Sequence, residues 1–91
     1  MLNNKLKITG GSLKSRSLSF NEASLLKPTK SYIRESIFNI IQLNKDMTCL
    51  DLFSGSGILT AEAISRGVKR ATLVENNFKT CQKIHSEFRK L

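Results

Sequence analysis

A glycine-rich turn at residues 51–57 separates two apolar stretches of different pattern. Residues 48–53 form a short apolar stretch, as expected of a buried strand, whereas residues 58–66 have the longer apolar pattern of a helix. Gly55 and Gly57 lack a Cβ, so the backbone can turn sharply there and approach a ligand closely. The free backbone N–H groups at the helix start would point at that ligand. This unit predicts an α/β sheet with a ligand-binding turn.

An acidic residue, Glu75, ends the next apolar run and lies 18 positions after Gly57. At about this spacing, a carboxylate on the second strand of a βαβ unit accepts hydrogen bonds from ribose hydroxyls. A dinucleotide is disfavoured, because Thr60 stands at the third glycine position of the G-x-G-x-x-G pattern. Asp51 instead suits a cofactor with a cationic amino acid tail, such as S-adenosylmethionine. An ordinary strand–helix turn in another kind of α/β protein stays the alternative.

The composition predicts a small folded protein without a targeting or membrane segment. The chain has 91 residues, 40% of them apolar, which suffices for one domain. No apolar stretch approaches the roughly 20 residues that cross a membrane, and residues 1–10 lack the apolar region of a signal peptide. Cys49 and Cys81 have no partners at metal-ligand spacing and are expected to be core thiols. We therefore expect a cytoplasmic protein without a bound metal.

Positive charge is concentrated in the first half of the chain. Residues 1–45 carry eight Lys or Arg against two Glu, a net charge of +6, whereas residues 46–91 carry seven basic against five acidic residues, a net charge of +2. Such a basic region is typical of a protein that binds a polyanion such as RNA. The alternative is a solvated basic surface, and Arg34 could also contact a cofactor carboxylate. The candidate RNA contacts are Lys5, Lys7, Lys14, Arg16, Lys27, Lys30 and Arg34.

The first half of the chain is predicted to form a hairpin and a helix. Residues 5–9 and 13–20 flank the Gly10-Gly11 pair, which accepts the positive φ angles of a hairpin turn. One face of the second strand would carry Lys14, Arg16, Leu18 and Phe20. A helix is predicted over residues 29–43, with Thr29 as its N-cap. Its apolar stripe would contain Ile33, Ile37, Ile40 and Ile41.

The second half is predicted to continue as strand, turn, helix, strand and helix. Gly67 stands where a left-handed C-cap would end the helix of residues 58–66. A strand over residues 70–75 follows, and Asn76 or Asn77 would cap the last helix. This helix is expected to reach the last residue, with an apolar stripe of Phe78, Cys81, Ile84, Phe88 and Leu91.

Several segments occur together in one order: Ile8-Thr9-Gly10-Gly11, a Lys27-Pro28-Thr29 helix start, the turn at residues 49–57, and residues 62–67 and 71–75. In this combination the chain resembles the RsmD family of bacterial 16S ribosomal RNA guanine-N2 methyltransferases. The resemblance implies an α/β fold, the N-terminal part of a class I S-adenosylmethionine-dependent methyltransferase with a Rossmann-like doubly wound sheet. Residues 1–26 would form a basic β-hairpin and loop, and residues 27–91 a helix and the incomplete Rossmann-like domain.

The resemblance also implies a cofactor and a substrate. S-adenosyl-L-methionine would donate a methyl group to a guanine amine of 16S rRNA in the small ribosomal subunit. Glu75 would hold the ribose hydroxyls, Asn76 would lie beside the adenine, and Asp51 would act through the amino group or a water. Lys27 stands where the family has an arginine, so a bidentate contact is lost. The residues that would surround the methionine part are Phe53, Ser54, Gly55, Ser56 and Gly57.

One family feature has no counterpart among these residues. The family carries an Asn/Asp-Pro-Pro-aromatic tetrapeptide that accepts hydrogen bonds from the target amine, whereas Pro28 is the only proline here. No catalytic residue is therefore assigned, and the 91-residue chain alone is expected not to methylate RNA. We also expect it to be marginally stable or to self-associate through its incomplete sheet. A cofactor- or RNA-binding module without chemistry stays open, and a dinucleotide-dependent oxidoreductase is disfavoured.

Overall fold

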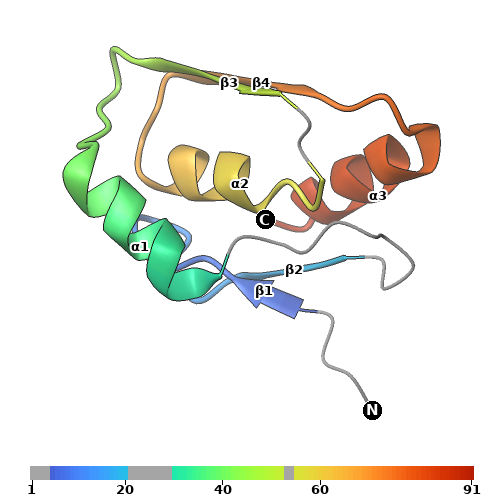
Figure 1. The fold of residues 1–91 in the computed structure, drawn as a ribbon, viewed down its shortest axis with the longest axis horizontal. Coiled ribbons are helices and arrows are strands. Elements are labelled where there is room, and N and C mark those ends of the chain that lie inside the picture. Colours follow the sequence, from blue (N-terminus) through green and yellow to red (C-terminus); the bar gives the residue numbers. More distant parts are fainter. Residues whose placement is uncertain (1–4, 21–29, 53–54) are drawn as a thin grey trace.

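A computed structural model describes residues 5–20, 30–52 and 55–91 of the chain. Figure 1 shows β3 and β4 as one layer, with α2 and α3 between them and the β1–β2 hairpin. A core of Ile8, Leu18, Ile58 and Ala61 joins the hairpin to α2. The elements follow one another as β1 (Lys5–Lys7), β2 (Ser17–Ser19), α1 (Ser31–Ile40), β3 (Thr48–Leu52), α2 (Ile58–Ser65), β4 (Arg70–Val74) and α3 (Phe78–Phe88).

The predicted hairpin is confirmed, but its strands are shorter than expected. β1 and β2 pair antiparallel, with Leu6 opposite Leu18. Residues 8–16 form a long turn, closed by hydrogen bonds between the backbones of Ile8 and Arg16 and of Ser15 and Ile8. Lys14 therefore lies in the turn rather than on a strand. The turn is long because it packs against α2, which the sequence pattern of the hairpin alone does not reveal.

β3 and β4 form the predicted parallel pair, with Asp51 opposite Leu73. The prediction of a buried strand was wrong, because exposed and half-buried residues alternate along both strands. Leu50 and Leu52 are 65% and 57% exposed. α2 and α3 cover one face of the pair (Figure 1). Within the described residues no element covers the other face, although parallel sheets are usually covered on both sides.

α1 differs from its prediction in both length and orientation. It begins after Lys30, which makes no side-chain capping bond, and ends at Ile40 rather than near residue 43. The predicted cap Thr29 lies outside the described residues. The predicted apolar stripe is wrong, since Ile40 is 83% exposed whereas Arg34 is only 2% exposed. The side of α1 that carries Arg34 faces α2, because Arg34 pairs with the buried carboxylate of Glu62 on that helix.

The predicted helix ends of α2 and α3 are mostly confirmed. Gly67 has a φ of +98° and donates to the Ile64 carbonyl, as a left-handed C-cap does. Asn77 caps α3 by accepting a hydrogen bond from the Thr80 backbone. α3 ends at Phe88 and so does not run to residue 91. Phe78 is 74% exposed and does not belong to the buried stripe, because it occupies the first position of the helix, away from the hairpin.

Both cysteines are free and only half-buried, so they are less enclosed than the predicted core thiols. Burial, with a smaller contribution from nearby Asp51, raises the pKa of Cys49. The Cys81 thiol donates to the Glu75 carbonyl at 3.1 Å. In the described part of the chain, no helix is long and apolar enough to cross a membrane, and no cluster of side chains is suited to a metal ion.

Glu87 links the hairpin to α3 and predicts a pH-dependent stability. Its carboxylate accepts from the Ser19 backbone at 2.6 Å and from Lys90 Nζ at 2.8 Å. Burial alone would raise the pKa of Glu87, but hydrogen bonds from Lys90 and Ser19 outweigh it and lower the pKa to about 2. The stabilisation is therefore complete above the ordinary pKa of 4.5 and is lost as the pH falls toward about 2.

The measurement compares urea denaturation of the wild-type chain and Glu87→Gln at several pH values. At pH 6 we expect the free energy of unfolding of the wild type to exceed that of Glu87→Gln by on the order of 2 kcal/mol. This value is lower than the pKa shift alone would give, because solvent screens the charges of the exposed lysine partners. The difference should shrink toward zero near pH 2. Glu35→Gln on exposed α1 serves as the control. A difference that is the same at every pH would contradict the assigned role of the Glu87 carboxylate.

Candidate functional site

The glycine turn sits at the N-terminus of α2, where the sequence placed it. Gly55 and Gly57 have φ angles of +57° and +81°, and Gly57 is the N-cap of α2. A Cβ on Gly57 would lie 3.1 Å from Phe88 Cε1 and 3.3 Å from Ile84 Cγ2. The backbone angle favours glycine at position 57, and a Cβ there would also be in tight contact with α3. Phe53 and Ser54 lie outside the described residues.

Glu75 reaches back from the end of β4 to the glycine turn. Its carboxylate accepts from the Gly55 backbone N–H at 3.1 Å and from the Asn77 backbone N–H at 3.1 Å. The two groups meet because the carboxyl ends of adjacent parallel strands lie at one edge of the sheet. A carboxylate has about four acceptor positions, so Glu75 can accept further hydrogen bonds. Asn76 beside it is exposed.

Asp51 is held by a residue to which the sequence analysis gave no positive role. Thr60 Oγ1, fully buried on α2, donates to Asp51 Oδ2 at 2.7 Å. In the glycine pattern, Thr60 stands out only because it replaces the third glycine. Its position one turn into the helix was the signal that could have identified it, since such a side chain faces the preceding strand. Asp51, Gly55 and Glu75 therefore lie at the same end of the β3–β4 pair.

A cavity of about 430 Å³ lies between β4 and α3, next to this end of the sheet. Its walls are mainly apolar, and its polar or charged lining residues are Glu75, His85 and Arg89. Glu75 thus both lines the cavity and contacts the glycine turn, so the cavity lies beside this turn. The lining residues are Leu73, Glu75, Cys81, Ile84, His85, Phe88 and Arg89.

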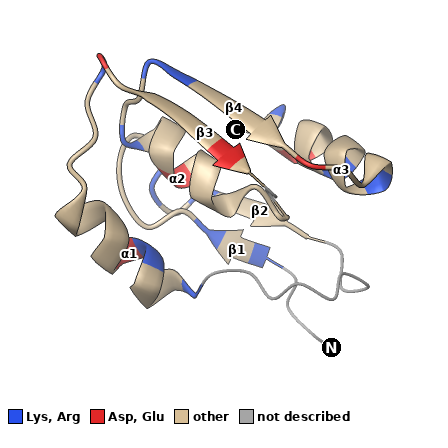
Figure 2. Ribbon diagram, turned by 45° about the horizontal axis from the view of Figure 1, so that its top comes forward, with Lys and Arg blue, Asp and Glu red and all other residues tan. Residues whose placement is uncertain are grey.

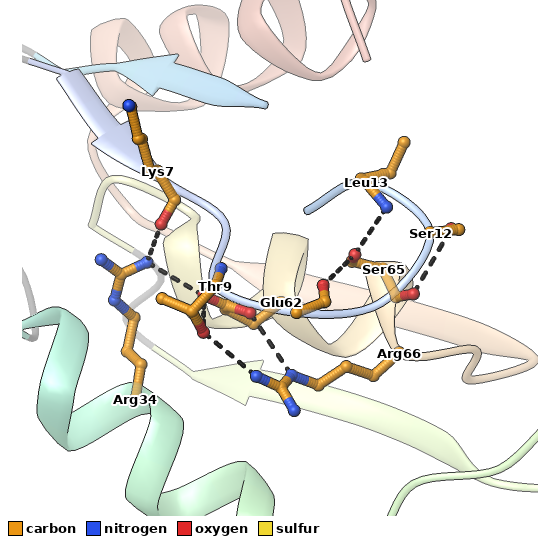
Figure 3. Close-up of polar contacts among 9 residues, drawn as sticks. Lys7, Thr9, Ser12, Leu13, Arg34, Glu62, Ser65 and Arg66 are labelled. Carbon is orange, nitrogen blue, oxygen red and sulfur yellow. Dashed lines mark hydrogen bonds and ion pairs between the residues drawn. The ribbon is translucent and has the colours of Figure 1, made fainter. Parts of the chain in front are cut away.

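A second polar cluster joins the hairpin to α2, and Figure 3 shows its contacts. The fully buried carboxylate of Glu62 accepts from the Thr9 backbone N–H at 2.7 Å and from Thr9 Oγ1 at 2.9 Å. The same carboxylate pairs with Arg34 Nη1 at 3.2 Å and with Arg66 Nε at 3.4 Å. Arg66 also donates to Thr9 Oγ1 at 3.0 Å and lies over the Phe38 ring.

Ser65, one turn beyond Glu62 on α2, holds the far side of the hairpin turn. Its hydroxyl donates to the Gly10 carbonyl and accepts from the Leu13 backbone N–H at 2.9 Å. The Ser65 carbonyl accepts from the Ser12 backbone N–H at 2.8 Å. Sequence reasoning assigned no role to Glu62, Ser65 or Arg66. The acidic residue in the middle of an otherwise apolar helix was the available signal, because a buried charge requires a partner.

Arg34 belongs to this cluster and not to the surface, which corrects its place among the candidate RNA contacts. Its Nη1 donates to the Lys7 carbonyl at 2.8 Å as well as to Glu62. Burial lowers the pKa of Arg34, and the charges of Glu62 and Glu35 oppose that shift. A guanidinium that is buried and paired in this way cannot reach a phosphate on the surface.

The remaining described candidates for RNA contact are exposed: Lys5, Lys7, Lys14, Arg16 and Lys30. Basic residues mark β1 and the start of α1 in Figure 2. Arg16 Nη2 donates to the Lys90 carbonyl at 2.6 Å, which ties the hairpin to the end of α3. Lys27 lies outside the described residues.

Comparison with known proteins places the chain among methyltransferases. Residues 6–91 match the family described as Conserved hypothetical protein 95. Ribosomal RNA small subunit methyltransferase D of Buchnera aphidicola is 44% identical over 79 residues, covering 86% of this chain and 41% of that protein. The protein of the same name from Escherichia coli K12 is 40% identical over 72 residues, which cover 78% of this chain and 36% of that protein.

The fold has relatives among solved structures as well. The structure of yhhF, a provisionally assigned methyltransferase from Escherichia coli, superposes with a TM-score of 0.78 at 31% identity and covers 94% of this chain. That superposition includes 46% of yhhF. The chain therefore spans less than half the length of the relatives named above.

Proposed function

We propose a function from the family of this chain. The chain belongs to the Conserved hypothetical protein 95 family, and its named relatives are methyltransferases of the RsmD type. Its α/β fold is the N-terminal part of a methyltransferase fold. The proposed reaction is methylation of a guanine N2 amine in 16S rRNA by S-adenosylmethionine. Residues 1–91 would supply the cofactor-binding half of that enzyme and part of its RNA surface.

The observation that supports this proposal most strongly is the contact between Gly55 and Glu75 at the N-terminus of α2. Glu75 would accept hydrogen bonds from the two ribose hydroxyls, and the adjacent apolar cavity gives the nucleoside a dry surface. Asp51, oriented by Thr60, would face the cationic amino group of the methionine part. S-adenosylmethionine would supply an activated methyl group, while these side chains bind and orient it.

Replacing Glu75 by Ala tests the cofactor site. Hydrogen bonds from two ribose hydroxyls to a carboxylate contribute about 1.5–3 kcal/mol, so the affinity for S-adenosylmethionine should fall roughly ten- to a hundredfold. Isothermal titration calorimetry measures this affinity. Glu35→Ala removes the same charge from exposed α1 and should leave the affinity unchanged. Equal affinities in the two variants, or preference of the wild type for NAD, would contradict the site.

The RNA surface is proposed to be the hairpin, because exposed cations gather there and at the start of α1. The relatives are named as methyltransferases of small-subunit ribosomal RNA, which supports the substrate class. Lys14 and Arg16 lie in the long turn that α2 holds, whereas Lys5 and Lys7 lie on β1. These four cations would contact RNA phosphates from one surface and leave the glycine turn free for the cofactor.

Replacing Lys14 and Arg16 together by Ser tests the RNA surface. Each phosphate contact contributes about 0.7–0.9 to the slope of log affinity against log salt, so this slope should become shallower by about 1.5. Filter binding of a 16S rRNA transcript at several KCl concentrations measures it. The matched control is Lys69→Ser with Arg70→Ser, an exposed basic pair at the start of β4. If both double variants change the slope equally, the hairpin has no special role.

A second candidate is a module that binds cofactor or RNA without chemistry. It is favoured by one observation, the lack of a Pro-Pro tetrapeptide among the 91 residues. We propose that residues outside this chain complete the acceptor site, and that the exposed face with Leu50 and Leu52 mediates self-association when they are missing. Transfer of a tritiated methyl group to 30S particles distinguishes the two candidates when residues 1–91 are assayed beside a longer chain that includes acceptor residues. Turnover by the longer chain supports the enzyme, and turnover by neither supports the binding module.

A further inference from the structure

We propose that Glu62 is a positioning residue, which fixes the basic hairpin relative to the glycine turn and so places the RNA-binding cations beside the cofactor site. This inference rests on the proposed function and adds a role for a residue that contacts neither ligand. The reason lies in α2, whose first residues contact the glycine turn and whose polar side chains hold the hairpin turn.

The first step is the geometry of α2. Gly57 caps the helix, Thr60 holds Asp51 of the proposed cofactor site, and Glu62 holds Thr9 of the hairpin. Glu62 lies five residues after Gly57, which is about 7.5 Å along a helix axis. Over so short a distance an α-helix behaves as a rigid spacer. The position of the hairpin turn relative to the glycine turn therefore depends on the side chains that attach this turn to α2.

The second step is the chemistry of that attachment. The hairpin is held to α2 by apolar contacts of Ile8 and Leu18 and by polar contacts of its turn to Glu62 and Ser65. At its other end, hydrogen bonds from Ser19 to Glu87 and from Arg16 to the Lys90 carbonyl join it to α3 and the residues that follow α3. Apolar contacts are non-directional, so they keep the hairpin attached without defining its orientation. The hydrogen bonds are directional and end on the turn of residues 9–13. Lys14 and Arg16 lie in the same turn just after residues 9–13, so the positions of their backbones depend on these bonds, while the Arg16 side chain is also held by the Lys90 carbonyl.

The third step is why the charge of Glu62 matters. Its buried carboxylate accepts from Thr9, Arg34 and Arg66 at once. A glutamine of the same shape has a single acceptor oxygen and an NH₂ group, which would face the donors of an arginine. Glu62→Gln should therefore release part of the hairpin turn while the apolar core still holds it. Thr9 and Arg34 both bond Glu62 Oε1, whereas Arg66 bonds Oε2, so the amide NH₂ would face Arg66. The Arg66 contact is therefore expected to loosen first, and with it the bond that Arg66 donates to Thr9 Oγ1.

The experiment compares the 91-residue chains Glu62→Gln and Glu35→Gln, which lose the same charge from α2 and from exposed α1. Filter binding of a 16S rRNA transcript across KCl concentrations should show a slope shallower by about 1.5 for Glu62→Gln than for Glu35→Gln, equal to two lost phosphate contacts. Affinity for S-adenosylmethionine should agree within about twofold between the two variants, because the glycine turn is intact. Hydrogen exchange of hairpin amides 9–16 should accelerate in Glu62→Gln alone.

Equal salt slopes and equal amide exchange in the two variants would overturn the positioning role. If Glu62→Gln fails to fold, Ser65→Ala replaces it, because this change removes only the hydroxyl bonds to Gly10 and Leu13. Ser65→Ala should also lower the slope and accelerate exchange at these amides. A wild-type chain that binds RNA without salt dependence would instead refute the proposed function, and amide exchange then decides the role of Glu62 by itself.

Discussion

Replacing Arg34 by Met should destabilise the protein by about 3 kcal/mol or more, although Arg34 lies in no predicted core. The guanidinium is almost fully buried and pairs with the equally buried Glu62 at 3.2 Å. Removing one partner of a buried ion pair typically costs about 3–5 kcal/mol, because the other charge stays in the interior without compensation. The lower end applies here, since Arg66 and Thr9 still donate to Glu62.

The control for this change is Lys30→Met, a basic residue one turn earlier that is exposed and makes no capping bond. It should alter the free energy of unfolding by less than about 0.5 kcal/mol, as surface substitutions usually do. Urea denaturation followed by circular dichroism measures both variants. A loss below about 1 kcal/mol in Arg34→Met would show that Arg66 alone compensates Glu62, and that α1 depends little on this pair.

Gly11→Ala is the second change with a large expected effect, about 3 kcal/mol of destabilisation. Gly11 has a φ of +81°, which costs an L-residue about 1–2 kcal/mol. The new Cβ would also overlap the Ser65 carbonyl oxygen of α2, because the hairpin turn rests directly on that helix. Such a clash with backbone typically adds about 1–3 kcal/mol, since neither segment can move without breaking hydrogen bonds.

Gly67→Ala separates the two contributions. Gly67 has a φ of +98°, but a Cβ there would meet no atom within 4 Å. Its destabilisation should therefore reflect the backbone angle alone, about 1–2 kcal/mol. Thermal and urea unfolding of both variants measures the difference. If Gly67→Ala is as destabilising as Gly11→Ala, the contact between the hairpin turn and Ser65 does not contribute, and the close packing of the turn on α2 is wrong.

Local signals in the sequence predicted the order of the elements and some of the helix ends. Gly67 and Asn77 mark helix ends because an αL cap and an Asn cap depend only on neighbouring residues. The pairing of Gly55 with Glu75 was also predictable, since consecutive strands of a parallel unit bring their carboxyl ends to one edge. The hairpin at Gly10-Gly11 followed from the turn chemistry, although the length of its turn did not.

Burial was where the predictions failed. Apolar periodicity identified a stripe on α1 and placed Phe78 in the core, yet Ile40 and Phe78 are exposed. Periodicity shows which side of a helix is apolar, but not which neighbour covers that side. The buried side of α1 is chosen by Arg34, whose partner Glu62 lies 28 residues away in the chain. Thr60, read only as a missing glycine, likewise gains its role from the distant Asp51.

The sequence by itself determined the order of the elements, the glycine turn with its acidic partner, and the family to which these motifs belong. Each of these depends on backbone angles, caps and spacing that act over a few residues or within one βαβ unit. The tertiary structure alone decided that α2 carries the hairpin through Glu62 and Ser65, and that Arg34 is interior. The physical reason is that a buried charge is stable only where folding brings its partner, and that pairing is a property of three-dimensional contact.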